Sequence, residues 1–199
     1  KGTAKPNLCI PGAGAVAEKV SAIMGVSSEG VEAKVAIVKC SGNTNVSGYV
    51  MDYQGPKTCV ACNSFYQGRR SCSHACLGFG DCVVVCPNNA ISIVDGIAVV
   101  DRTKCIGCGL CAKQCPNHLI DIIPATLRAY VACSSCDKGA YTRKVCKAGC
   151  IGCKKCEKEC PVGAITVVNN VAVIDHSKCT NCGHCAEICT TGCIAAVDL

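Results

Sequence analysis

Hydrophobic positions recur with two different periods along this chain. Over residues 12–25 they fall at helical intervals and the segment closes at Gly25, so we predict a short amphipathic helix. Residues 33–40 and 128–133 are short hydrophobic stretches that each end in a cysteine, Cys40 or Cys133. Both stretches predict strands.

Two further stretches alternate between hydrophobic and polar positions on either side of a turn dipeptide. In the first, residues 90–94 and 97–101 flank Asp95-Gly96. In the second, residues 164–168 and 171–175 flank two asparagines. Alternation around such a dipeptide predicts a β-hairpin in each case.

Each predicted hairpin is enclosed by cysteines with a characteristic spacing. Residues 150–161 read C-x2-C-x2-C-x3-C-P, which is the bacterial run for a [4Fe–4S] cluster. Three closely spaced thiolates bind three irons of one cubane, and the cysteine before the proline serves a second cluster. A partner run with the same internal spacing follows at Cys179, Cys182, Cys185 and Cys189.

The same pair of runs also occurs upstream. Cys86 precedes Cys160 by the same number of residues as Cys105 precedes Cys179, and we call this constant separation the offset of the repeat. Cys105, Cys108, Cys111 and Cys115 form a full run, whereas the run before it is irregular. There Phe79 stands opposite Cys153, and we expect Cys72, which aligns with Cys146, to supply the missing ligand. A repeat of this length indicates a duplicated module.

The predicted fold is therefore α+β, with tandem duplicated two-cluster bacterial ferredoxin modules behind a small N-terminal α/β segment. We place the segment at 1–58, the first module at 59–127 and the second at 128–199. Exchange of one cysteine between paired runs predicts four [4Fe–4S] ligand sets. They are Cys72, Cys76, Cys82, Cys115; Cys105, Cys108, Cys111, Cys86; Cys150, Cys153, Cys156, Cys189; and Cys179, Cys182, Cys185, Cys160.

The remaining cysteines are too numerous to serve only as hydrophobic filler. We assign filler to Cys193, which aligns with Leu119. We predict at least one additional cluster, with ligands drawn from Cys40, Cys59, Cys62, Cys133, Cys136 and Cys146. Spacing alone does not fix a set of four among them. The alternative is that they are reduced thiols held apart by packing.

Composition changes this picture little. The chain has 24 cysteines in 199 residues, which also suits a disulfide scaffold, and C-x2-C pairs suit a zinc module. Neither alternative requires the x3-C-P spacing.

The net charge of +6 largely offsets the negative charge of loaded clusters, and no aromatic residues accompany the basic ones, so we expect no nucleic-acid partner. We expect no flavin or NAD on this chain, because it lacks a complete phosphate-binding glycine motif.

Several segments resemble the B subunit of the Rnf complex, the iron–sulfur subunit of a ferredoxin:NAD+ ion-translocating oxidoreductase. The most specific are the irregular run at 72–82 and Arg143-Lys-Val-Cys146, and others lie at 7–12, 34–42 and 137–153. The resemblance implies a subunit that accepts electrons from reduced ferredoxin and passes them to membrane subunits, alongside cytoplasmic subunits of the complex. A ferredoxin-like subunit of a soluble hydrogenase or dehydrogenase is the alternative.

The resemblance also implies a location at the cytoplasmic face of the cell membrane. Family members carry a membrane-anchoring helix and a cysteine-rich segment ahead of this region. We therefore expect an upstream part to precede Lys1. By resemblance, Cys9 is the last ligand of a cluster in that upstream part.

Overall fold

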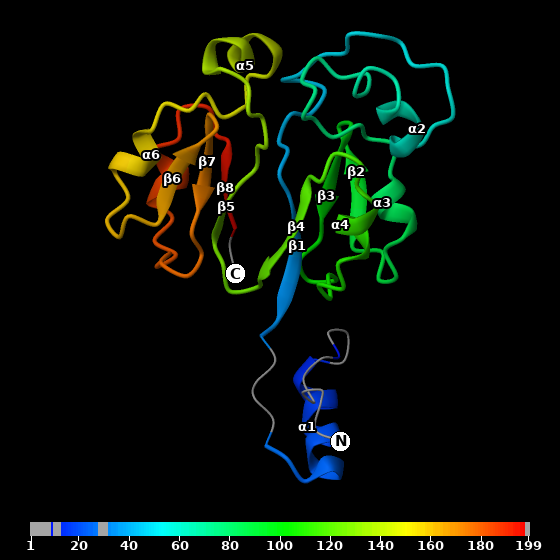
Figure 1. Ribbon diagram of the computed structural model, residues 1–199, viewed down its shortest axis with the longest axis vertical. Coiled ribbons are helices and arrows are strands. Elements are labelled where there is room, and N and C mark those ends of the chain that lie inside the picture. Colours follow the sequence, from blue (N-terminus) through cyan, green and yellow to red (C-terminus); the bar gives the residue numbers. More distant parts are fainter. Residues whose placement is uncertain (1–8, 10–12, 28–31, 198–199) are drawn as a thin grey trace.

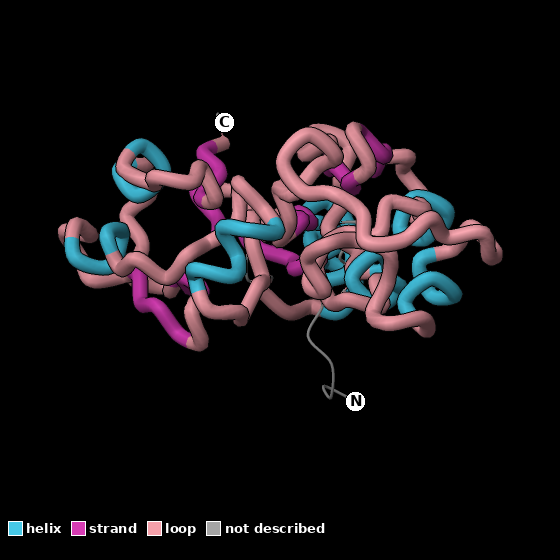
Figure 2. The backbone as a smooth tube through the Cα atoms, turned by 90° about the horizontal axis from the view of Figure 1, so that it is seen from above, coloured by secondary structure: helices cyan, strands magenta, loops and turns pink. Residues whose placement is uncertain are grey.

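A computed structural model of the chain describes residues 9, 13–27 and 32–197, so most of the resembling stretch at 7–12 lies outside the described residues. Figure 1 shows two lobes side by side, each made of short strands and short helices. The first lobe runs from β1 to β4 (34–124) and the second from β5 to β8 (129–196). Figure 2 shows the same two lobes from above, with loops making up much of the path.

Both predicted hairpins are present. In the first lobe β2 (Ile91–Val94) pairs antiparallel with β3 (Ile97–Val100), and in the second β6 (Ile165–Val168) pairs with β7 (Val171–Ile174). The two turn residues of each hairpin have positive φ, 47° and 78° in the first and 48° and 65° in the second. A two-residue turn of this kind matches the twist of the strands, and Asp, Asn and Gly are the residues that tolerate it.

Both predicted cysteine-terminated strands are also present, and each has a partner that the pattern did not predict. β1 (Lys34–Val38) pairs with β4 (Ile120–Pro124), and β5 (Ala129–Val131) pairs with β8 (Ile194–Ala196). The two partner strands begin at Ile120 and Ile194, which are related by the same offset as the cysteine runs. Each lobe thus has one hairpin and one sheet closed by a distant strand.

Four of the short helices present cysteines to the lobe interiors. They are α3 (Asp81–Val84), α4 (Leu110–Gln114), α6 (Lys155–Lys158) and α7 (His184–Glu187). The residue before each helix has a left-handed backbone, with φ between 59° and 84°. Three of these four residues are glycine, which adopts this conformation without steric cost. The other helices of the lobes are α2 (Cys59–Asn63) and α5 (Gly139–Val145).

The lobe interiors combine small aliphatic side chains with thiols. In the first lobe Ile91, Leu119 and Ile120 are buried beside cysteines, and in the second Ile165, Ile174 and Ile194 are. Such thin cores supply limited hydrophobic stabilisation, and small domains of this kind usually depend on metals or cross-links.

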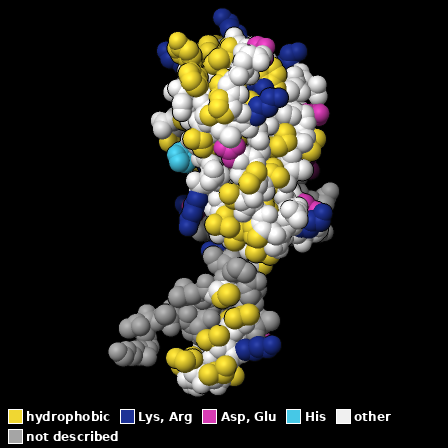
Figure 3. All heavy atoms as spheres, turned by 90° about the vertical axis from the view of Figure 1, so that its right-hand side faces the viewer, with side chains coloured by type: hydrophobic (Ala, Val, Ile, Leu, Met, Phe, Trp, Pro, Cys, Tyr) yellow, Lys and Arg dark blue, Asp and Glu magenta, His cyan; other side chains and the backbone are white. Residues whose placement is uncertain are grey.

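The predicted helix over 12–25 is α1 (Ala13–Met24), which projects from the end of the lobes. Figure 3 shows hydrophobic side chains on its surface, and Ile23 is 85% exposed. Among the described residues no helix has the length and apolar character needed to cross a membrane.

Candidate metal centres

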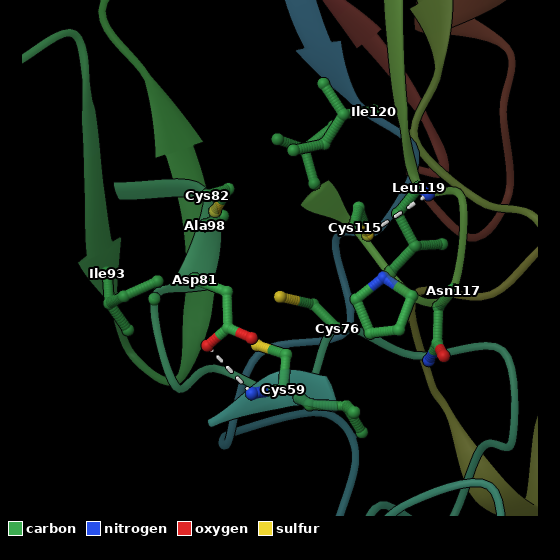
Figure 4. A pocket seen from close by; sticks show the side chains of 14 residues that line it. Cys59, Cys76, Asp81, Cys82, Ile93, Ala98, Cys115, Asn117, Leu119 and Ile120 are labelled. Atoms are coloured by element: carbon green, nitrogen blue, oxygen red, sulfur yellow. Dashed lines mark hydrogen bonds between the residues drawn. The ribbon is translucent and has the colours of Figure 1, made fainter. Parts of the chain in front are cut away.

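The first group of cysteines, called here the Cys82 group, lines a pocket of the first lobe. It comprises Cys59, Cys76, Cys82 and Cys115. Figure 4 shows the four side chains around this pocket, with Cys59 at the start of α2 and Cys82 within α3. Burial, together with the neighbouring charges of Cys76, Cys59 and Cys115, raises the pKa of the Cys82 thiol to about 12.

Backbone and carboxylate contacts hold this group in place. The Asp81 carboxylate accepts hydrogen bonds from the amides of Cys59 at 2.8 Å and Val60 at 3.1 Å. The Leu119 amide donates to the Cys115 sulfur at 3.4 Å. Asp81 therefore fixes the start of α2, and with it Cys59, against α3.

The structure does not bring Cys72 to this pocket, although the sequence analysis placed it in this ligand set. Cys72 lines a different pocket, and Cys59 lies beside Cys76, Cys82 and Cys115 in its place. The sequence analysis named Cys59 only as a possible further ligand. Local spacing could not identify it, because Cys59 reaches the group through the hydrogen bond to Asp81, which is distant in the sequence.

The second group, called the Cys111 group, comprises Cys86, Cys105, Cys108 and Cys111. The Ala90 amide donates to the Cys86 sulfur at 3.3 Å, and the Ala36 amide of β1 donates to the Cys105 sulfur at 3.3 Å. Burial, together with the nearby charges of Cys105 and Cys108, raises the pKa of the Cys111 thiol to about 11. One cysteine of the irregular run thus lies among three from the following run.

The second lobe repeats this arrangement in the Cys185 group. Cys160, Cys179, Cys182 and Cys185 line one pocket, and Cys156 also belongs to its lining. The Ala164 amide donates to the Cys160 sulfur at 3.3 Å, which matches the bond from Ala90 to Cys86. Burial again raises the pKa of the Cys185 thiol, with Cys179 and Cys182 as the nearest charged neighbours.

The remaining ligand set of the second lobe gathers around Cys156. Cys150 and Cys156 are buried in the core of the second lobe, and Cys189 packs against it; with Cys153 we call these four the Cys156 group. Burial, together with the charges of Cys150, Cys153 and Cys189, raises the pKa of Cys156 to about 11. Cys193 lies beside them, with its sulfur 3.6 Å from that of Cys189. A hydrogen bond from Cys193 lowers the pKa of Cys150 to about 6.

The structure also places the cysteines that lie outside these four groups. Cys40, Cys72, Cys133 and Cys146 line a pocket between the lobes, and we call them the Cys72 group. Cys62 is fully buried beside Leu77. Cys9 and Cys136 are exposed.

The donor sets fit iron–sulfur clusters. All 24 cysteines carry free thiols, so each group can offer four thiolates. Backbone amides point at sulfurs in several groups, and such hydrogen bonds tune cluster potentials. No three His, Cys, Asp or Glu side chains of the described residues converge as ligands of a single metal ion do.

Thiol groups on one-turn helices beside β-hairpins define an iron–sulfur protein with two 4Fe–4S ferredoxin-type domains. Residues 149–193 match the 4Fe-4S dicluster domain, and residues 98–121 match the 4Fe-4S binding domain.

Curated relatives identify the family. The chain is 46% identical over 195 residues to the B subunit of the proton-translocating ferredoxin:NAD(+) oxidoreductase complex of Clostridium ljungdahlii, covering 96% of this chain and 69% of the relative. It is 40% identical to the B subunit of the ion-translocating oxidoreductase complex of Methanosarcina acetivorans, covering 92% and 70%. It is 37% identical to the Na(+)-translocating counterpart of Acetobacterium woodii, covering 98% and 59%. The chain belongs to this family of B subunits, as the resemblance predicted.

Proposed function

We propose that this chain is the electron-transfer subunit of an ion-translocating ferredoxin:NAD+ oxidoreductase complex. In this role it accepts electrons from reduced ferredoxin at the cytoplasmic face of the membrane and passes them to membrane subunits. The observation that supports this most strongly is the gathering of four or five cysteines around single pockets in both lobes. The names of the curated relatives supply the donor and the kind of complex.

We infer that two tandem two-cluster ferredoxin modules, related by duplication, hold four [4Fe–4S] clusters. The hairpins, the strands β4 and β8 and the amide bonds at Cys86 and Cys160 recur at the same offset and support this inference. The proposed ligand sets are the Cys82, Cys111, Cys156 and Cys185 groups, with Cys59 in place of Cys72.

When bound, each cluster supplies one-electron chemistry. The chain's own residues would set the conditions for it. Cysteine thiolates hold the iron, backbone amides donate to sulfurs, and the buried aliphatic side chains limit the access of water. No proton has to move at any side chain for an electron to pass.

The direct test is electron transfer from reduced ferredoxin. Oxidised, cluster-loaded chain is mixed anaerobically with a reduced two-cluster bacterial ferredoxin, the two proteins are separated on an anaerobic column, and the visible absorption of each is recorded. We expect the chain's absorption to bleach while that of ferredoxin recovers. A chain that holds iron and sulfide but stays oxidised beside excess reduced ferredoxin would refute the donor assignment. The same chain loaded with zinc serves as the control.

A further inference from the structure

The pocket between the two lobes is lined by four cysteines that no ferredoxin run requires. Cys40 follows β1 and Cys133 follows β5, while Cys72 and Cys146 come from the loops that precede the cysteine runs. Cys72 and Cys146 are each 7% exposed. We propose that the Cys72 group binds a fifth [4Fe–4S] cluster, which connects the two modules; this rests on the proposed iron–sulfur function.

The sulfurs approach one another in a space that a glycine keeps open. A Cβ atom at Gly42 would lie 3.2 Å from the Cys146 sulfur and 3.7 Å from the Cys40 sulfur. All four cysteines belong to the lining of one pocket, together with Gly42. The four thiols therefore face a common volume rather than four separate parts of the core.

Each lobe contributes an equivalent pair to this pocket. Cys72 and Cys146 are related by the offset of the repeat. The Cys76 amide donates to the Cys40 sulfur at 3.4 Å, and the Cys150 amide donates to the Cys133 sulfur at 3.2 Å. The two donors are related by the same offset, so Cys40 and Cys133 occupy corresponding places.

The strands that deliver this second pair are anchored identically. In each case the residue before the cysteine donates its backbone amide to the carbonyl of the residue before the partner strand. Lys39 donates to Leu119, which precedes β4, at 2.7 Å, and Ala132 donates to Cys193, which precedes β8, at 2.7 Å. Backbone bonds also join the lobes at the pocket, from Ser41 to Ala132 at 2.9 Å and from Lys147 to Val46 at 2.9 Å. The pocket is thus a fixed junction between the lobes.

A buried cation beside the pocket points independently to an anionic occupant. Arg70 is 3% exposed, and its guanidinium donates to the carbonyl of Gly42, a residue that lines the pocket. Its Nε and Nη1 have no hydrogen-bond partner, and the ion pairs among the described residues do not include it. A buried charge without a counter-charge is costly. A cluster with four thiolates carries a net negative charge and would compensate it.

The position of the pocket gives the fifth cluster a specific role. Cys40 is bonded to the amide of Cys76, in the Cys82 group, and Cys133 is bonded to the amide of Cys150, in the Cys156 group. A cluster here would take one electron from a neighbour in one lobe and give it to a neighbour in the other, with no bond made or broken. The two modules then form one continuous relay.

Iron and acid-labile sulfide analysis of the anaerobically reconstituted chain tests the proposal. Four irons per cluster predict about 20 irons per wild-type chain and about 16 in Cys72→Ser or Cys133→Ser. The double variant Cys72→Ser/Cys133→Ser should also keep about 16, because both residues serve one cluster. Cys62→Ser, at a buried cysteine outside the lining of this pocket, is the matched control and should equal the wild type.

The outcomes separate this proposal from the proposed function. A wild-type value near 16 irons, or about 12 in the double variant, would overturn the fifth site and leave the four-cluster function standing. A wild-type chain that takes up zinc but no iron and sulfide would instead refute the iron–sulfur function itself. The wild-type count needs no substitution, so a variant that fails to fold does not remove the test.

Discussion

The carboxylate of Asp81 binds the backbone amide of Cys59, with a distance of 2.8 Å between oxygen and nitrogen. This contact joins two segments that the cysteine spacing does not connect. It also puts a negative charge beside the Cys82 group, whose pocket Asp81 lines. Both effects can be measured.

Replacing Asp81 by Asn should raise the midpoint potential of the cluster in the Cys82 group. A negative charge near a cluster disfavours the added electron, so its removal favours reduction. A redox titration followed by electron paramagnetic resonance measures the shift. Asp52→Asn removes the same charge at an exposed position outside the lining of this pocket, and should leave the potential unchanged. An unchanged or lower potential in Asp81→Asn would contradict the assignment.

Cys59 should be required for the same cluster. Cys59→Ser should lose about four irons per chain, whereas Cys62→Ser, on the same helix α2, should lose none. Iron analysis of the two variants provides the comparison. Equal iron in both variants would mean that Cys59 is not a ligand.

Cys193 should tune the cluster of the Cys156 group without binding iron. Its sulfur lies 3.6 Å from the sulfur of Cys189, within hydrogen-bond distance of this ligand. A donor to a ligand sulfur stabilises the reduced cluster, so Cys193→Ala should lower the midpoint potential at unchanged iron content. Cys136→Ala, at an exposed cysteine, is the control. Loss of about four irons in Cys193→Ala would instead make it a ligand.

Two glycines with nearly the same backbone conformation should respond differently to alanine. Gly107 has φ of 64° and its Cβ position lies against the Lys34 carbonyl of β1, whereas Gly163 has φ of 60° and open space around it. Gly163→Ala should cost about 1–2 kcal/mol, the penalty for a left-handed alanine. Gly107→Ala should cost more, because β1 must move. Thermal unfolding of the loaded variants tests this, and equal midpoints would contradict it.

Local pattern was sufficient for the elements whose stabilising contacts are close in sequence. The helix over 12–25, both hairpins and the strands leading to Cys40 and Cys133 all follow from periodicity and turn residues. The strands β4 and β8 were missed, because each is defined by pairing with a strand from the opposite end of its lobe. Nothing in a short hydrophobic stretch identifies such a partner.

The same distinction applies to the cysteines. The regular runs yielded groups that the structure places together, such as Cys86 with Cys105, Cys108 and Cys111. In the irregular run, spacing favoured Cys72, but tertiary contacts bring Cys59 to that pocket. The repeat did contain an indication that Cys72 lies elsewhere, because Cys72 aligns with Cys146. In the structure these two cysteines line one pocket.

The central claim is that this chain carries electrons one at a time through several [4Fe–4S] clusters. A stoichiometric reductive titration of the loaded chain tests it most directly, with the number of electrons taken up per chain as the result. The account predicts about five electrons, one for each of the five proposed clusters, with bleaching of the visible absorption throughout. A metal-loaded chain that takes up no electrons would contradict it.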